Sequence, residues 1–242
     1  MTISPAIIEL NKVNYTFPGG NPVLKEMDFT LQQGQRVGMI APNGSGKTTL
    51  LHLMVGLLKP DAGSIYYQGK QCVEEKDFHQ LRRKVGLLFQ DADDQLFSPT
   101  VLEDVAFGPL NLGKSKEEAI ELSKKTLHFL GLVGFEDRVT FKLSGGEKRL
   151  VALATILSME PEVLLLDEPT AGLDESTKGR LITILNQLEI SYIVVSHEFD
   201  FVSEVTEAIY TVRDGKVMLD SEKYLHRHLH SHTYGSESHE HR

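Results

Sequence analysis

The sequence predicts an α/β fold built on a parallel sheet, and three observations predict it. Short, uninterrupted apolar runs at 84–89, 163–166 and 192–195 are typical of strands that are covered on both faces. Helix-like stretches alternate with these runs along the chain. A further apolar strand, Val37–Ala41, leads through a glycine-rich turn into a helix predicted over Lys47–Leu58.

Turn residues set the next boundaries. Pro60–Gly63 should end that helix, and Ser64–Tyr67 resumes an extended pattern that we assign to an antiparallel β subdomain. Near the other end of the chain, Tyr210–Met218 contains two β-rich runs joined by Asp214 and Gly215. Such a pair of runs around Asp-Gly predicts a β-hairpin.

Between the strands at 84–89 and 163–166 lies a helix-rich section. Ser115 and Glu118 have the spacing of a capping box, which predicts a helix that reaches about Leu130. A second helix should start near Gly146. We therefore expect a helical insertion at about 91–158, within a main domain that covers 1–225.

Composition excludes several classes of protein. The 242 residues are 40% hydrophobic and 24% charged, which is ordinary globular composition. Cys72 is the only cysteine, so no disulfide can form within the chain. The first residues lack the pattern of a signal peptide, and no apolar run reaches the roughly 20 residues of a membrane span, so we expect a soluble protein. A net charge of −9 argues against nonspecific binding of nucleic acid.

The turn at 41–48 nearly matches the phosphate-binding pattern GxxxxGK[ST], with Ala41 in place of the first glycine. Gly44 and Gly46 let backbone N–H groups converge on phosphate oxygens, and the next helix adds the positive end of its dipole. Lys47 supplies a charge for the phosphates, and the Thr48 hydroxyl can ligate Mg²⁺. This context predicts a P-loop nucleotide-binding core, in preference to a glycine-rich turn with an exposed lysine.

Two carboxylates, Asp167 and Glu168, follow the buried run at 163–166. In P-loop ATPases an aspartate in this place lies beside magnesium, and the adjacent glutamate is placed to polarise the attacking water. Alone, two acidic residues at the end of a strand are common. Together with the phosphate loop, they predict an ATP-hydrolysing site.

The segment Leu143-Ser144-Gly145-Gly146-Glu147 resembles the signature motif of ATP-binding cassette (ABC) ATPases, with Glu147 where glutamine is commoner. A serine and two glycines at a helix start can offer a hydroxyl, N–H groups and a helix dipole to an anion. The resemblance implies that two subunits pair head to tail and that each signature completes the partner's ATP site.

The remaining motifs of that family appear in order, and the resemblance covers nearly the whole chain except the tail. Gln90 matches the Q-loop glutamine, Ala171–Asp174 the D-loop, His197 the switch histidine, and Phe17 the aromatic residue that stacks on adenine. The resemblance implies catalytic roles for Glu168, His197 and Gln90, Mg²⁺ ligation by Thr48, Gln90 and Asp167, and ATP contacts from Phe17, Asn43, Gly44, Ser45, Gly46, Lys47, Thr48, Thr49, Ser144, Gly145, Gly146 and Asp174.

A narrower resemblance lies in residues 90–113, which are similar to the ATPase subunits of energy-coupling factor transporters. It implies a groove here for the coupling helices of a transmembrane subunit. Leu96, Phe97 and Phe107 are equally compatible with that groove and with the core of the insertion. The partners implied are a second ATPase copy or a paralogous ATPase, a transmembrane coupling subunit and a substrate-binding membrane subunit, at the cytoplasmic face of the membrane.

Six of the ten histidines lie in the tail at 226–242. Imidazoles at alternate positions can chelate Ni²⁺, Co²⁺ or Zn²⁺, although a solvated polar tail explains them equally well. With the family resemblance, the tail favours import of cobalt or nickel over import of a vitamin. Two further alternatives are a soluble ABC ATPase that acts on nucleic acid or ribosomes and a P-loop kinase of small molecules. The absence of a second cassette argues against the former, and the signature motif argues against the latter.

Overall fold

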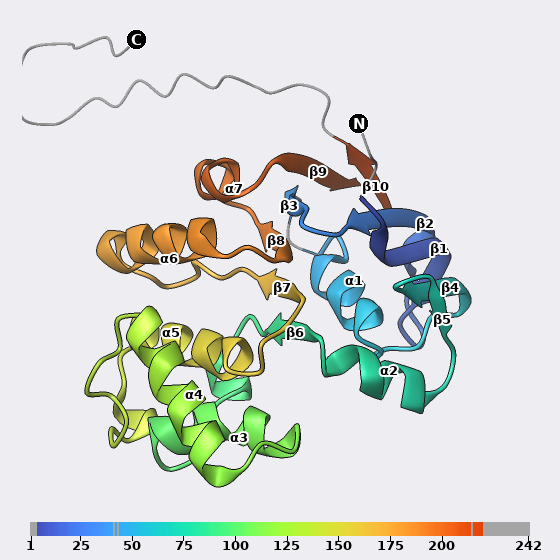
Figure 1. The fold of residues 1–242 in the computed structure, drawn as a ribbon. Helices are drawn as coiled ribbons and strands as arrows, with labels where there is room; N and C mark the ends of the chain where they lie inside the picture. The colour runs from blue at the N-terminus through green and yellow to red at the C-terminus, as the bar shows by residue number, and fades with distance from the viewer. Residues whose placement is uncertain (1–3, 41, 43, 214, 220–242) are drawn as a thin grey trace, which may run out of the picture.

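In the computed structural model, the described residues are 4–40, 42, 44–213 and 215–219. They form two β-sheets with helices packed around them (Figure 1). The larger sheet has the strand order β10-β9-β3-β8-β7-β6. Its strands are β3 (Arg36–Ile40), β6 (Val85–Leu88), β7 (Val163–Asp167), β8 (Ser191–Ser196), β9 (Ala208–Arg213) and β10 (Lys216–Leu219).

All neighbouring pairs in this sheet are parallel except β10 with β9, which confirms the predicted parallel core and the terminal hairpin. Every residue of β7 and of β8 is buried. Along β7, Leu165 packs into one apolar cluster while Leu164 and Leu166 pack into another. Because alternate side chains point to opposite faces, a strand covered on both sides reads as a continuous apolar run.

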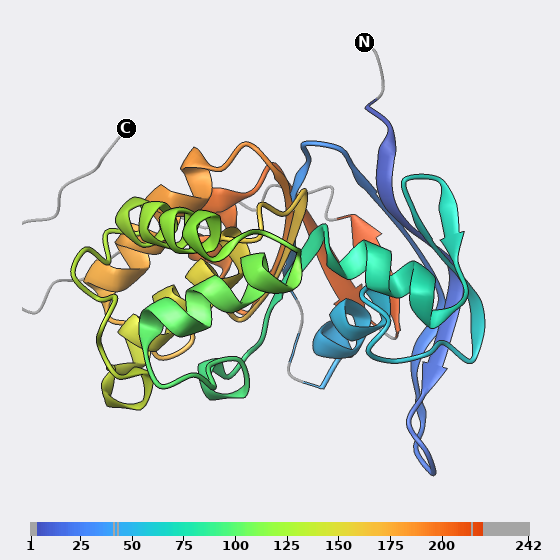
Figure 2. The same cartoon turned by 60° about the horizontal axis from the view of Figure 1, so that its bottom comes forward.

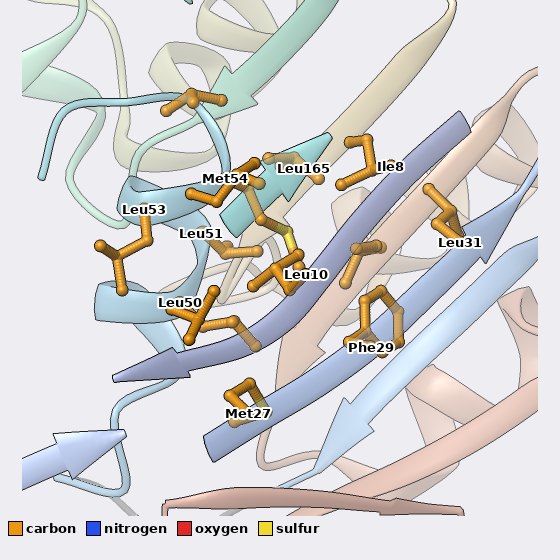
Figure 3. Packing of buried hydrophobic residues seen from close by; sticks show 14 of the residues in the cluster. Ile8, Leu10, Met27, Phe29, Leu31, Leu50, Leu51, Leu53, Met54 and Leu165 are labelled. Atoms are coloured by element: carbon orange, nitrogen blue, oxygen red, sulfur yellow. The ribbon is translucent and has the colours of Figure 1, made fainter. Parts of the chain in front are cut away.

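The smaller sheet is antiparallel, with the order β2-β1-β4-β5. Its strands are β1 (Ala6–Thr16), β2 (Pro22–Gln32), β4 (Ala62–Tyr67) and β5 (Lys70–Cys72). Helix α1 (Lys47–Met54) packs its leucines against β1 and β2, as the side chains of Leu50, Leu10 and Met27 show in Figure 3. Leu165 of β7 belongs to the same cluster, so α1 is held between the two sheets. This packing fixes the helix that follows the phosphate loop.

The prediction that the first helix reaches Leu58 is wrong, because α1 ends at Met54. Gly56 has a φ of 70°, and its N–H donates to Leu53 O at 3.0 Å while the Leu57 N–H donates to His52 O at 2.9 Å. This pair of bonds is a Schellman motif, which needs a residue in the left-handed region. Glycine adopts that conformation at least cost, so Gly56 ends the helix before Pro60 does.

Residues 91–158 contain α3 (Val101–Asn111), α4 (Lys116–Phe129), α5 (Gly145–Leu157) and the short 3-10 helices η1 (Ala92–Asp94) and η2 (Thr140–Lys142). The helix expected from Ser115 and the one expected near Gly146 are thus confirmed. The other helices are α2 (Glu75–Arg82), α6 (Glu175–Gln187) and α7 (Phe199–Val205). Figure 2 shows α3, α4 and α5 grouped at the side of the molecule away from the antiparallel sheet.

Candidate functional site

The phosphate loop, Gln90 and the two carboxylates line one hollow of about 500 Å³, a usual size for a small-molecule site. It lies where β3 and β7 end, which is where α/β sheets bind ligands. Its lining residues are Phe17, Val23, Gly44, Ser45, Gly46, Lys47, Thr48, Thr49, Gln90, Asp167 and Glu168. Asn43 and Ala41 lie outside the described residues, so the predicted ATP contact of Asn43 and the place of Ala41 in the loop stay predictions.

Two glycines shape the loop. Gly44 and Gly46 have φ angles of 78° and 93°, and a Cβ on Gly46 would lie 2.6 Å from the Val23 side chain. Gly46 is the N-cap of α1, so the N-terminus of that helix opens toward the hollow. The Ser45 hydroxyl is buried without a hydrogen-bond partner in the described part of the chain. A loop that turns its polar groups toward a cavity in this way fits a phosphate ligand.

Asp167 ends β7 with only 3% of its surface exposed. Its Oδ2 accepts a hydrogen bond from the Thr48 hydroxyl at 2.5 Å, while Oδ1 has no hydrogen-bond partner among the described groups. Burial raises the pKa of this carboxyl. A hydroxyl and one carboxylate fit Mg²⁺, because this ion takes few protein ligands and completes its shell with phosphate and water.

Glu168 lies between Lys47 and His197. Its Oε1 is 3.7 Å from Lys47 Nζ, and its Oε2 is 2.9 Å from His197 Nδ1. The residue adopts a φ of 45°, and its N–H donates to Val195 O at 2.8 Å. A non-glycine residue in this conformation costs roughly 1–3 kcal/mol, and such strain is concentrated at functional sites. Glu168 therefore contacts the histidine that matches the switch motif, although His197 does not line the hollow itself.

Phe17 follows the end of β1 and lines the same hollow with 45% of its surface exposed. Its ring packs edge-to-face on Tyr15 at a centroid distance of 5.0 Å. This contact holds one edge of the ring while the rest stays open, as a residue that stacks on a base requires.

The signature residues Ser144 and Gly146 lie outside this hollow, and Gly145 lines only a neighbouring one. Ser144 caps α5: its Oγ accepts the Glu147 N–H at 3.3 Å, and the Glu147 carboxylate accepts the Ser144 N–H at 2.8 Å. That N–H lowers the pKa of Glu147, whose charge also pairs with Arg138 at 2.9 Å. The N–H groups of the first helical turn have no partner within the helix.

Asp174 also lies outside the hollow, and its side chain caps α6. It accepts bonds from the Ser176 hydroxyl and from the Thr177 N–H and hydroxyl, and the Ser176 hydroxyl is the main reason that the pKa of Asp174 is strongly lowered. A Cβ on Gly146 would lie 3.4 Å from Thr177. A Cβ on Gly146 would also lie 3.6 Å from Leu173, so the signature helix and the D-loop meet within one chain. Gly145 shares the neighbouring hollow with Thr48 and Asp167, while Ser144 and Gly146 line neither hollow.

A second hollow, of about 270 Å³, is lined by Phe97, Phe107, Leu57 and Asp104 among others. Phe97 and Phe107 pack edge-to-face at 4.8 Å and remain 67% and 48% exposed. Leu96, in contrast, packs against the buried core. Phe97 and Phe107 thus line an exposed hollow, while Leu96 is half-buried against the core.

Three polar residues that contact these segments were not anticipated from the sequence. Arg149 of α5 donates to the backbone of the Q-loop, Asp104 is buried in the second hollow, and Arg138 pairs with Glu147. The only signal for Arg149 was a charged residue within the largely apolar run that follows the signature motif. Neither Asp104 nor Arg138 belongs to a recognisable motif, because both act through contacts between distant segments.

A strand, a glycine-rich loop and a helix that place Lys47 and Thr48 beside two carboxylates define a P-loop nucleotide-hydrolysing protein. The family model for the ABC transporter matches residues 24–171. A putative ABC transporter ATP-binding protein of Nitratidesulfovibrio vulgaris is 49% identical over 99% of this chain and 88% of its own length.

Two more relatives narrow the class. An energy-coupling factor transporter ATP-binding protein of Methanothermobacter thermautotrophicus is 43% identical over 88% of this chain and 70% of its own. The structure of CbiO1 from Clostridium perfringens, described as part of an ABC transporter complex, superposes with a TM-score of 0.80 at 34% identity, over 89% of this chain and 88% of its own. This chain belongs to the ABC transporter family and is an ATPase of the energy-coupling factor type.

Proposed function

We propose that this chain binds ATP and Mg²⁺ in the hollow at the phosphate loop, and that ATP hydrolysis there powers the uptake of cobalt or nickel through a transmembrane partner. The observation that carries the proposal is the meeting of Lys47, Thr48, Gln90, Asp167 and Glu168 at one hollow. The Ser45 hydroxyl and Asp167 Oδ1 are buried without a hydrogen-bond partner in the described part of the chain, which suits oxygens that contact a phosphate and a metal ion.

Each residue at the hollow has a role that its surroundings support. Lys47 and the N–H groups at 44–48 bind the phosphates, while Phe17 stacks on the base. Thr48, Asp167 and Gln90 hold Mg²⁺, which when bound neutralises the charge that develops on the transferred phosphoryl group. Glu168 accepts the proton of the attacking water, and His197 holds the carboxylate in position from its other side.

The active form on this proposal is a head-to-tail dimer, either of two copies or with a paralogous ATPase. Its support is that Ser144, Gly145 and Gly146 lie outside their own chain's phosphate hollow. The N-terminus of α5 combines unsatisfied N–H groups with the positive end of a helix dipole, so it suits a phosphate of the partner's ATP. The capping box occupies the N–H groups of Ser144 and Glu147, so this role falls to the N–H groups of Gly145 and Gly146.

The groove at Phe97 and Phe107 is our proposed contact for the transmembrane partner. Both rings are largely exposed, as an unpartnered docking surface requires. Asp104 at this groove is 2% exposed; its Oδ1 accepts the N–H groups of Phe97 and Ser98, while Oδ2 has no hydrogen-bond partner in the described residues. A partner segment with apolar side chains and one strong donor would complement this surface.

No helix among the described residues is long and apolar enough to cross a membrane. On this proposal the ATPase lies at the cytoplasmic face, residues 1–225 form the ATPase domain with its helical subdomain at about 91–158, and 226–242 form a histidine-rich tail. That tail is outside the described residues, so its composition alone supports a metal cargo. A vitamin as cargo is the main alternative.

The test is ATPase activity with the membrane subunits solubilised in detergent, compared with RNA or ribosomes as the addition. We expect stimulation by the membrane subunits alone, and its loss in Phe97→Ser/Phe107→Ser. Stimulation by RNA or ribosomes would refute the transport role. For the cargo, calorimetric titration of Ni²⁺ should detect binding to the full chain and not to a chain ending at Tyr224, with equal ATPase activity in both. Equal metal binding by the two forms would remove the support for a metal cargo.

A further inference from the structure

Arg149 is a buried cation that the chemistry proposed above does not use. It lies on α5, five residues beyond the Ser144 cap, and is only 5% exposed. Its guanidinium donates from Nη1 to Phe89 O at 2.6 Å and from Nη2 to Gln90 O at 2.5 Å. The two carbonyls are consecutive in the chain, and the planar fork of an arginine reaches both at once.

Burying this charge is costly, and the cost is only partly offset. Burial lowers the pKa of Arg149, while the charges of Asp91 and Asp167 act in the opposite direction. Its two hydrogen bonds given above go to neutral carbonyls rather than to a carboxylate. Burying this charge costs free energy, and in return the guanidinium gains only two backbone contacts. This indicates that the position of the Phe89–Gln90 backbone matters to the protein.

A second side chain ties the same backbone to the same helix. Gln95 Oε1 accepts the Phe89 N–H at 3.3 Å, and Gln95 Nε2 donates to Ala152 O and to Thr155 Oγ1, both at 2.8 Å. The N–H and the C=O of Phe89 are thus both bound to groups held by α5. Any shift of α5 must carry the backbone of Phe89 and Gln90 with it.

From these contacts we infer that Arg149 is a positioning residue, which sets the place of Gln90 at the phosphate hollow and joins it mechanically to the signature end of α5. The inference rests on the proposed role of Gln90 in holding Mg²⁺. Helix α5 then connects two sites, because its N-terminus faces the partner's nucleotide while Arg149 holds the glutamine of its own site. Binding of the signature motif to the partner's ATP therefore positions Gln90 to bind Mg²⁺ in the chain's own site.

The test compares Arg149→Gln and Arg149→Lys with wild type in ATPase assays at saturating ATP and varied Mg²⁺. We expect turnover to fall at least tenfold and the half-activating Mg²⁺ concentration to rise several-fold, because a misplacement of about 1 Å can cost a hundredfold. Affinity for ATP should stay within twofold. Lysine should not rescue either property, since an ammonium group cannot hold two carbonyls in a fixed plane.

Arg36→Gln is the matched control. Arg36 also donates to a backbone carbonyl, that of Leu188 at 2.8 Å, but it starts β3 at the end remote from the phosphate loop. Its loss should lower the Tm without changing Mg²⁺ activation. If Arg149→Gln does not fold, Gln95→Leu removes the second tie and should raise the half-activating Mg²⁺ concentration in the same direction.

The double variant Gln90→Ala/Arg149→Gln separates a positioning role from a structural one. If Arg149 acts through Gln90, adding Arg149→Gln to Gln90→Ala should cost no further turnover. If Arg149→Gln lowers turnover in the Gln90→Ala background as much as it does in the wild-type background, the inference is overturned. Normal Mg²⁺ activation of Arg149→Gln, when that of Gln90→Ala is impaired, would also overturn it. Normal Mg²⁺ activation in Gln90→Ala would instead overturn the proposed role of Gln90.

Discussion

Replacing Glu168 with glutamine changes the charge at the proposed water-activating position and almost nothing else. Glutamine has nearly the same shape, and its carbonyl can still accept the His197 N–H. The amide cannot take a proton from water. Because general-base catalysis contributes roughly 10²–10⁴-fold, the barrier should rise by about 3–5 kcal/mol.

The effect on folding should be much smaller. The gross attraction between Glu168 and Lys47 at 3.7 Å is about 4–5 kcal/mol at an effective dielectric constant of ~20. Desolvation of both ions offsets most of it, and removing the carboxylate also relieves its repulsion with Asp167, which helps to raise the pKa of that residue. We expect a net change within about 2 kcal/mol, or a Tm shift of no more than about 8 °C.

The assay measures phosphate release, affinity for a fluorescent ATP analogue, and elution from a sizing column with Mg²⁺ and ATP. Glu168→Gln should bind ATP normally, turn over at least a hundredfold more slowly and persist longer as a dimer. The control is Glu198→Gln, which changes the same group at a carboxylate that pairs with Thr170 and Lys178 and does not line the hollow. Normal turnover in Glu168→Gln would refute the assignment.

Four further changes test other parts of the molecule. Lys47→Ala should weaken ATP binding by a hundredfold or more, with the fold intact by circular dichroism; unchanged nucleotide affinity would exclude the phosphate-loop role. Mixing Lys47→Ala with Ser144→Arg subunits should restore ATP-dependent closure at one composite site, and its absence in proven heterodimers would argue for sites within one chain. Gly56→Ala should cost about 1–3 kcal/mol in a thermal melt, because its Cβ would lie 2.3 Å from the Phe78 ring at a left-handed φ; an unchanged Tm would contradict this. The lowered pKa of Glu147 means that the stabilisation by its charge is complete above the usual carboxyl pKa and is lost as pH falls through the lowered value. Glu147→Gln should therefore reduce the drop in Tm between about pH 5 and 3, and an equal drop would show that the charge of Glu147 contributes nothing to stability.

Local patterns were sufficient for the parallel sheet and for most of the phosphate hollow. A strand buried on both faces must be apolar throughout, so β7 and β8 are legible as runs of letters. The phosphate loop is equally legible, because glycines at fixed spacing and a following Lys47 are needed wherever backbone N–H groups surround phosphate. The end of α1 shows the limit of this reasoning. The turn that begins at Pro60 predicted the end of the helix, but α1 ends earlier, at Met54, where Gly56 adopts a left-handed conformation.

Tertiary structure alone decided the contacts between segments that are far apart in the chain. The Arg149 fork on the Q-loop spans 59 and 60 residues of sequence, and Glu168 meets His197 across 29. The tertiary structure also separated Phe97 and Phe107, which line a hollow, from Leu96, which packs against the core. The composition of a segment and the spacing of its residues predict its local conformation and which of its faces is buried. Which side chain satisfies a carbonyl in another segment depends on how the sheets and helices pack, and no local pattern contains that information.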